Sequence, residues 1–404
     1  MSNRFRSNSL AAFSLACMLL ALSACEGTKE GKPAAPAAAP TPALGKPADS
    51  GKEAPTTAMP YTKEVVATKL NVPWDMDFAP DGRIFLTERG GTIRVIDKGK
   101  LQEEPAYRFE APLQSKGEGG LLGMALDKDF KTNHYLYVYY TYQEGGQTRN
   151  RVIRMIESGG KVKPDKVLLD NLPGENIHNG GRIKVGPDGL LYITNGDASK
   201  PSIAQDVTQL GGKILRIRPD GTIPQDNPFP GSPVYSLGHR NPQGLSWHPE
   251  TGKLYSTEHG QTAHDEVNLI EPGTNYGWPL IEGDVSQVPA KDAGKLGPGP
   301  LKVPILHSGT TTWAPSGITF VTKGPWKGNL MVANLRGTQL QRMILGSDGT
   351  SVAKVEELFK NELGRIRNVA EAPDGSLYII TNNRDGRGKP TADDDQLIRL
   401  KPAF

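Results

Sequence analysis

One sequence pattern recurs six times in this 404-residue chain and constrains its fold more than any other feature. Each copy has a short apolar alternation, a turn that reads Pro-Asp-Gly in its clearest form, and a second strand rich in Leu, Tyr, Ile and Thr. An Asp-Gly turn supplies the backbone freedom of a tight reversal, so each copy predicts a β-hairpin. The six copies occupy residues 76–87, 122–138, 182–193, 244–255, 316–332 and 367–379.

The spacing of these hairpins predicts a closed ring of sheets. Successive turns lie roughly 45 to 75 residues apart, which leaves room for a four-stranded sheet and a variable loop. Six such units without a strong helical stretch predict an all-β fold, a six-bladed β-propeller, over residues 61–404 as one domain. We expect a strand near Val65 to pair with the C-terminal strand at 396–400, which would leave no free edge. A long β-sandwich or two smaller β domains is the alternative, but a regular repeat fits it poorly.

The composition is typical of a turn-rich globular chain. With 47 Gly and 33 Pro, about one residue in five is Gly or Pro, well above average usage. The 36% of hydrophobic residues is enough for a core and excludes global disorder. A formal net charge of +3 on so long a chain is weak, so we expect no nucleic-acid partner.

The first 25 residues resemble a bacterial lipoprotein signal peptide. Arg4 and Arg6 supply a positive start, and residues 10–22 form an apolar segment too short for a stable membrane span. The segment ends in Leu-Ser-Ala-Cys, which is similar to a lipobox, so Cys25 is expected to carry a diacylglycerol. An ordinary secretory peptide, with Cys25 incidental, is the alternative.

Cleavage before Cys25 would remove Cys17, so the mature chain would have no disulfide and no free thiol. Glu26 follows the cysteine where the usual inner-membrane retention signal is Asp, so we expect a lipid anchor in the outer membrane, facing the periplasm. Residues 26–60 are rich in Ala and Pro without periodicity and are predicted to be a disordered tether.

Common catalytic signatures are scarce in the body of the chain. It contains no Gly-x-Ser-x-Gly elbow, no Gly-rich phosphate loop before a helix and no histidine spacing of a zinc helix. The unusual segments adjoin the hairpins instead, and they occupy residues 177–182, 237–244, 258–266 and 275–279. Loops at strand ends near a propeller channel are a common place for sites.

Three of these runs carry a family resemblance. Residues 239–244 read His-Arg-Asn-Pro-Gln-Gly, 265–270 read Asp-Glu-Val-Asn-Leu-Ile, and 275–279 read Asn-Tyr-Gly-Trp-Pro. In this order they resemble the soluble quinoprotein glucose/aldose sugar dehydrogenases (glucose/sorbosone dehydrogenase-like), which use pyrroloquinoline quinone (PQQ) and calcium. The match covers nearly all of the chain after the tether.

The resemblance implies a catalytic set. His178 matches the general base that takes the proton from the anomeric hydroxyl as hydride leaves C1 for the quinone, and Asp197 matches the carboxylate that orients it. Arg240 would stabilise the oxyanion formed on the reduced quinone. Without the resemblance, a lone loop histidine is more often a plain hydrogen-bonding residue, and an isolated Arg more often bridges two loops.

The resemblance also implies binding residues. The positions that match cofactor contacts are Glu118, Arg240, Asn241, Thr312, Arg336, Arg365 and Arg367. Strand alternation places Arg365 and Arg367 on one side, where they could grip cofactor carboxylates. The backbone carbonyls of Gly260 and Gln261 match the ligands of a calcium ion.

A second, structural calcium position is matched by Glu266 and Tyr276, for which a solvated acid and a packing aromatic are the alternative. Three residues depart from the family pattern. Glu118 replaces Gln, which adds charge or else takes a raised pKa by burial; Arg336 replaces Lys; and Gln261 replaces Pro.

The function implied is oxidation of aldose sugars to lactones, with electrons passed to a quinone or cytochrome acceptor. A sorbosone-type aldehyde dehydrogenase uses the same chemistry and stays open. A non-catalytic propeller that binds sugars or proteins is the alternative of a different class, because a fold alone does not fix a function.

The lipid anchor is directly testable. Cells that express the chain in the presence of a radioactive fatty acid should label the mature protein at Cys25. A mature protein without label would contradict the lipoprotein assignment.

Overall fold

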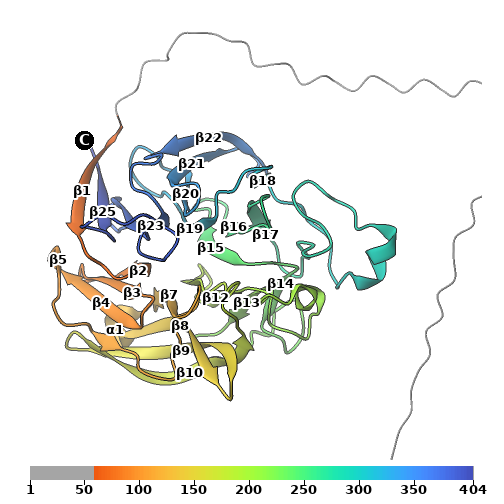
Figure 1. The fold of residues 1–404 in the computed structure, drawn as a ribbon, viewed down its shortest axis with the longest axis horizontal. Helices are drawn as coiled ribbons and strands as arrows, with labels where there is room; N and C mark the ends of the chain where they lie inside the picture. The colour runs from red at the N-terminus through yellow and green to blue at the C-terminus, as the bar shows by residue number, and fades with distance from the viewer. Residues whose placement is uncertain (1–58, 404) are drawn as a thin grey trace, which may run out of the picture. The chain divides into compact units, whose positions relative to one another are not determined.

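The computed structural model describes residues 59–403, which form a ring of six antiparallel sheets around a central axis (Figure 1). The predicted six-bladed β-propeller is therefore confirmed. The predicted signal peptide with Cys25, and the tether up to residue 58, lie outside the described residues. In the described part of the chain, no helix has the length and apolar character needed to cross a membrane.

The six predicted hairpins are the two inner strands of the six blades. The innermost strands are β2 (Pro73–Phe78), β7 (Leu121–Leu126), β11 (Ile183–Val185), β15 (Pro242–Trp247), β19 (Pro315–Phe320) and β23 (Ile366–Glu371). The second strands are β3 (Ile84–Glu88), β8 (Tyr135–Glu144), β12 (Leu191–Asn195), β16 (Leu254–Glu258), β20 (Leu330–Asn334) and β24 (Leu377–Thr381).

Each blade is completed by a third strand and an outer strand. The third strands are β4 (Thr92–Asp97), β9 (Gln147–Ser158), β13 (Lys213–Ile217), β17 (Glu266–Ile270), β21 (Gln339–Leu345) and β25 (Leu397–Pro402). The outer strands are β5 (Lys100–Leu101), β10 (Lys161–Pro173), β14 (Val234–Leu237), β18 (Leu306–His307), β22 (Val352–Leu358) and β1 (Tyr61–Ala67). A further short strand, β6 (Tyr107–Arg108), also pairs with β4. Within residues 59–403 the helices are short: α1 (Phe130–Asn133) and the 3-10 helices η1 (Pro201–Gln205) and η2 (Ala290–Lys295).

The Asp-Gly turns have the geometry that their sequence predicts. Gly82 and Gly189 have φ angles of +91° and +75°, in the left-handed region that a residue without a Cβ adopts freely. The N–H of Gly189 donates to the carbonyl of Gly186 at 2.8 Å and closes the turn. These glycines therefore set the hairpin geometry locally, before any contact between blades.

The ring closes through its two ends, as the sequence predicts. Strand β1 pairs antiparallel with β25, with Tyr61 opposite Pro402 and Val65 opposite Ile398. The last blade thus combines the first strand of the described chain with the last three, and its outer strand is supplied by the N-terminal side. This pairing removes the free edge that an open ring would present.

The hydrophobic core is divided into six clusters, one between each pair of neighbouring blades. Phe85 of β3 and Leu136 of β8 are fully buried in one of them, and Ile379 of β24 is fully buried in another. Since every blade buries both faces against neighbours, an incomplete ring would expose two apolar faces to water. The apolar free energy of the fold therefore depends on closure.

The antiparallel order of the strands also fixes where the functional loops lie. Each blade has four principal strands, so every innermost strand runs in the same direction along the axis. The segments that enter the innermost strands and the turns from second to third strands therefore lie at one end of the ring. We call this the loop end.

Closure can be tested at one paired position of β1 and β25. Ile398 is 1% exposed, so Ile398→Ala should lower the free energy of unfolding by about 2–5 kcal/mol, because it leaves a cavity between blades. Its partner Val65 is 49% exposed, so Val65→Ala should lose less than about 1 kcal/mol. Chemical denaturation of both variants checks this, and equal losses would contradict the burial of Ile398 between the blades.

Candidate functional site

The predicted site residues gather at the loop end of the ring. One group directly precedes innermost strands: Glu118, His178, Arg240, Thr312 and Arg365. A second group follows second strands: Asp197, Gly260 and Arg336. Residues up to 269 positions apart in sequence are thus brought together by blade geometry alone.

His178 and Asp197 form a hydrogen-bonded pair. His178 Nδ1 lies 2.8 Å from Asp197 Oδ1, and the Asp197 side chain is fully buried. The other carboxylate oxygen accepts a hydrogen bond from the indole Nε1–H of Trp278 at 2.8 Å. This pattern assigns the proton to Nδ1 and leaves the lone pair on His178 Nε2, so the imidazole can accept a proton there.

Trp278 is a site residue that the sequence reasoning did not single out, although it lies in the run at 275–279. Its ring lies 5.3 Å from the Arg240 guanidinium, so it contacts both the carboxylate partner of His178 and the neighbouring cation. Arg240 Nη1 donates to the His259 carbonyl at 3.3 Å, while its buried Nε has no partner among residues 59–403. Burial lowers the pKa of Arg240, against the opposing charges of Asp197 and Glu258.

Asn241 joins two of the loops. Its Oδ1 accepts from the Gly180 N–H at 3.0 Å, and its Nδ2 lies 3.5 Å from His259 Nδ1. His259, also missed although it directly precedes Gly260, has a buried Nε2 without a partner in the described chain, and burial lowers its pKa. Asn241 therefore holds this imidazole beside the axis.

Glu118 is an ionised carboxylate that bridges two distant loops. Its Oε1 accepts from Arg387 Nη1 at 2.8 Å, and its Oε2 accepts from the His178 N–H at 3.1 Å. Burial opposes its ionisation, but the charges of His259 and Arg387 and the two hydrogen bonds prevail and lower the pKa of Glu118 to about 2. Arg387 is the counter-charge in direct contact with Glu118. The raised pKa considered for Glu118 is therefore wrong, and the added negative charge is the outcome.

Arg367 is a buried guanidinium on β23. It donates to Gln243 Oε1 and Ser316 Oγ, each at 3.2 Å, and to Asn382 Oδ1 at 3.3 Å. All three acceptors are neutral, and its Nε has no partner in residues 59–403. Burial and the nearby charge of Arg365 lower the pKa of Arg367 to about 9, despite the attraction of Asp385. This group lacks a counter-anion.

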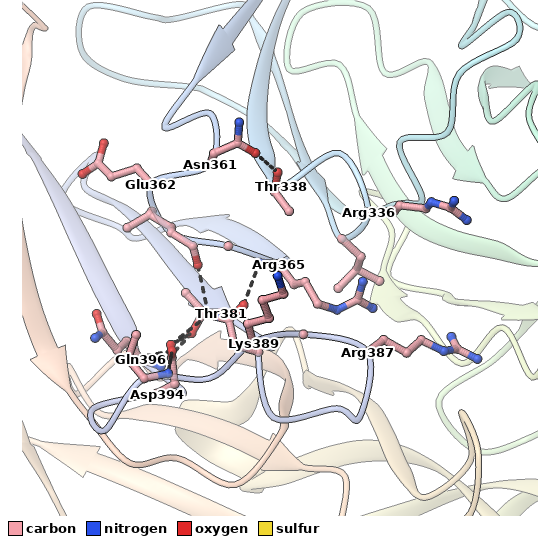
Figure 2. A pocket seen from close by; sticks show the side chains of 16 residues that line it. Arg336, Thr338, Asn361, Glu362, Arg365, Thr381, Arg387, Lys389, Asp394 and Gln396 are labelled. Carbon is pink, nitrogen blue, oxygen red and sulfur yellow. Dashed lines mark hydrogen bonds between the residues drawn. The ribbon is translucent and has the colours of Figure 1, made fainter.

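Arg365 differs from Arg367 because it is already paired. Its Nε and Nη2 lie 3.0 and 2.6 Å from Asp385 Oδ2, and Asp385 is 3% exposed at its side chain. Figure 2 shows Arg336, Arg365 and Arg387 around a cavity of about 530 Å³. Arg367 lines a different, small cavity at the axis, so Arg365 and Arg367 line two adjoining cavities.

Three cavities adjoin across the loop end. Arg387 lines both the cavity of Figure 2 and the axial cavity with Glu118 and Arg367. His259 lines both the axial cavity and a third one, which also contains Arg240 and Gly260. Five of the predicted cofactor residues thus line cavities that share lining residues: Glu118, Arg240, Arg336, Arg365 and Arg367. Asn241 and Thr312 line none of the three, and Thr312 donates from Oγ1 to the Thr262 carbonyl at 2.8 Å.

The loop of Gly260 and Gln261 is tightly folded. A Cβ at Gly260 would lie 1.9 Å from the Ala263 carbonyl, so only glycine fits. The Gly260 N–H donates to Asp265 Oδ1 at 3.0 Å, and Gln261 N donates to Glu282 Oε1 at 3.2 Å. Between residues 59 and 403, no group of three or more His, Cys, Asp or Glu is placed to hold a metal. A cation at this loop would rely on backbone carbonyls, which is what the family resemblance implies.

Glu266 and Tyr276 line the same third cavity, but with different chemistry. Glu266 lies opposite Glu258 across β16 and β17, and burial together with that carboxylate raises the pKa of Glu266 to about 8. The Tyr276 hydroxyl donates to the Leu269 carbonyl at 2.7 Å and accepts from the Glu271 N–H at 2.9 Å. That hydroxyl is therefore already engaged and is not a free metal ligand.

The arrangement can do two things. It can remove a proton at His178 Nε2 with Asp197 as the charge-stabilising partner, and it can hold an anion against Arg240 and Arg367, whose buried Nε–H groups are unpaired.

The chain is similar to known sugar dehydrogenases in sequence and in structure. A family model described as Glucose / Sorbosone dehydrogenase matches residues 70–398. The chain is 30% identical to aldose sugar dehydrogenase YliI of Escherichia coli strain K12, over 80% of this chain and 90% of that protein. It is 31% identical to quinoprotein glucose dehydrogenase B of Acinetobacter calcoaceticus, over 80% and 85% of the two chains. The solved PQQ-bound aldose sugar dehydrogenase of Streptomyces coelicolor aligns with a TM-score of 0.74 at 38% identity, over 84% and 98% of the chains.

Proposed function

This chain belongs to the glucose/sorbosone dehydrogenase family, and from that membership we propose that it oxidises aldose sugars to lactones with PQQ as cofactor. The observation that carries the proposal is the His178–Asp197 pair, set beside two buried guanidinium groups that lack an anion. PQQ-bound and quinoprotein relatives support the cofactor assignment.

The residues present suit an anionic cofactor. Arg240 and Arg367 each have an unpaired buried Nε–H, and Arg336 lines the adjoining cavity. A carboxylate-bearing cofactor would satisfy these donors and neutralise charge that burial otherwise disfavours. When bound, PQQ supplies the two-electron acceptor for hydride from the sugar C1.

The protein's own part in the reaction is proton removal. The sugar loses a hydride from C1 and a proton from its C1 hydroxyl, and His178 Nε2 is the atom free to take that proton. Asp197 stabilises the resulting imidazolium, and the Trp278 indole N–H keeps the carboxylate from rotating away.

We further propose that the carbonyls of Gly260 and Gln261 hold a calcium ion, which would place a positive charge beside the quinone. The tight turn at Gly260 supports this, because it fixes the backbone without any side-chain ligand. Lipid anchorage at Cys25 in the outer membrane, exposure to the periplasm, and transfer of electrons to a quinone or cytochrome complete the proposal.

Two alternative functions differ from the oxidation of aldoses, one in its substrate and the other in having no catalytic activity. A sorbosone-type dehydrogenase would use the same residues on a different carbonyl compound, whereas a non-catalytic propeller would have no need for the His178–Asp197 pair. The hydrogen bond of Asp197 to His178 and the unpaired Nε–H groups of Arg240 and Arg367 favour an enzyme over a non-catalytic binding protein.

Reconstitution tests the proposal. Purified apoprotein with PQQ and calcium should reduce a redox dye with glucose or another aldose, and His178→Ala should lower kcat about 10²–10⁴-fold, because the general base is lost. Omitting calcium should lower the rate, and its re-addition should restore it.

Sorbosone is run alongside the aldoses. A preference for sorbosone would favour the aldehyde dehydrogenase. Activity that is equal in wild type and His178→Ala, or absent with every sugar tested, would contradict the proposed function.

A further inference from the structure

A buried glutamine lies behind the proposed proton-accepting pair, and no role assigned so far uses it. Gln205 is the last residue of η1, in the loop that begins with Asp197 after β12, and it is 7% exposed. Buried amide groups have hydrogen-bond partners, because an unpaired donor or acceptor away from water is costly. The partners of the Gln205 amide therefore show what this residue holds in place.

The Gln205 amide holds the turn that carries Trp278. Gln205 Nε2 donates to the Trp278 carbonyl at 2.7 Å and to Asn275 Oδ1 at 3.1 Å. Gln205 Oε1 accepts from Asn275 Nδ2 at 2.8 Å and from the Gly297 N–H at 2.9 Å. Asn275 Oδ1 also accepts from the Gly277 N–H at 2.9 Å, so the two amides and the turn form one closed network. Both Nε2 hydrogens and the carbonyl oxygen of Gln205 are thus engaged with this turn and its neighbour.

Trp278 is fixed by both polar groups of its backbone. Gln205 pairs with its carbonyl, and its N–H donates to the Gly238 carbonyl at 3.0 Å. The position of the backbone decides whether the indole Nε1–H can reach Asp197 Oδ2, to which it donates at 2.8 Å. Asp197 Oδ1 in turn lies 2.8 Å from His178 Nδ1. A continuous chain of contacts therefore runs from Gln205 to the proposed base.

The helix that carries Gln205 is itself anchored to the ring. Lys213 is the first residue of β13 and is fully buried. Its Nζ donates at 2.7–3.0 Å to three backbone carbonyls, those of Ile203, Ala204 and Gly211. Because these bonds attach η1 to a blade strand, Gln205 has a rigid support from which to hold the Trp278 turn. Such a support is what a residue needs if it is to fix the geometry of a reacting group.

We infer that Gln205 is a positioning residue for the proton transfer. It fixes the Trp278 backbone so that the indole N–H meets Asp197, and Asp197 thereby keeps its orientation toward His178. Among residues 59–403 the hydrogen bonds of Gln205 include none to Asp197 or His178, so its effect on the reaction should pass through Trp278. The inference rests on the proposed function, because His178 is the proposed acceptor of the sugar proton.

The indole N–H of Trp278 gives a readout that needs neither sugar nor cofactor. The chain has five tryptophans, and Trp278→Phe identifies the Trp278 signal in the ¹H–¹⁵N spectrum of the apoprotein. In Gln205→Met that signal should shift upfield and exchange with water faster, because the N–H loses its carboxylate acceptor. Gln341→Met is the matched control: it removes another buried glutamine amide, on β21, and should leave the signal unchanged.

Kinetics of the PQQ-loaded enzyme test whether the contact matters for the reaction. Gln205→Met should lower kcat for glucose about five- to fiftyfold with KM within about twofold, because the base loses its orientation and the sugar keeps its contacts. In a Trp278→Phe background the same change should lower kcat less than about twofold, since the contact through which Gln205 acts is already absent. Gln341→Met should change neither kcat nor KM.

The outcomes separate this inference from the proposed function. An unchanged Trp278 signal in Gln205→Met overturns the inference, and so does an equal loss of kcat with and without the Trp278 indole. If the wild type oxidises no sugar, the proposed function fails, and the Trp278 signal alone then decides whether Gln205 positions the indole on Asp197.

A second variant covers the case in which Gln205→Met does not fold. Gln205→Glu, measured above neutral pH, keeps the acceptor for Asn275 and Gly297. Its ionised carboxylate has no hydrogen to donate to the Trp278 carbonyl. The same shift of the Trp278 signal and the same loss of kcat are expected, and their absence overturns the inference.

Discussion

The buried ion pair between Asp75 and Arg182 is the interaction on which the ring depends. Asp75 on β2 is fully buried, Arg182 directly before β11 is 1% exposed, and Arg182 Nη1 lies 2.7 Å from Asp75 Oδ1. The same carboxylate accepts from Asn368 Nδ2 of β23 at 2.6 Å and from the Met124 N–H of β7 at 3.2 Å. One side chain thus joins four blades at the axis. Because a buried charge without its partner is strongly destabilising, the complete ring is the state in which these charges are tolerated.

Positive charge exceeds negative charge along the axis, and this excess links the fold to its function. The Trp74 ring lies 4.2 Å from the Arg182 guanidinium and 5.4 Å from that of Arg367. Asp75 compensates Arg182, but Arg367 has no ion-pair partner among residues 59–403. An anion at the loop end would compensate Arg367 in the same way. Strand β23 of the rigid ring therefore also supplies one guanidinium group of the proposed cofactor site, that of Arg367, and the loops supply Arg240, His178 and Asp197.

The sequence could predict what depends on neighbours in the chain. Period-two alternation and Asp-Gly turns are local, so the six hairpins follow from them. The pairing of the strand at Val65 with the C-terminal strand follows from the expectation that six such units close into a ring without a free edge. The site residues came from the family resemblance, since His178 and Asp197 have no local signature. Side-chain contacts between loops that are distant in sequence could not be predicted: Trp278 with Asp197, Arg387 with Glu118, and Asp385 with Arg365. Those partners lie on different blades or in the long loop before β25. Asp385 pairs with Arg365, and Arg367 is left without an ion-pair partner among residues 59–403.

The affinity for PQQ of a variant that removes the charge of Arg367 tests the central claim most directly. Arg367→Met keeps the apolar volume and removes the uncompensated guanidinium, so the fold should be retained. Fluorescence titration with PQQ in calcium buffer should give a Kd at least about tenfold higher than that of the wild type. Arg399→Met, which removes a cation paired with Asp374 on the outside of the last blade, should leave the Kd unchanged. The same Kd for Arg367→Met and wild type would contradict the claim that the axis of the propeller binds the cofactor through its excess positive charge.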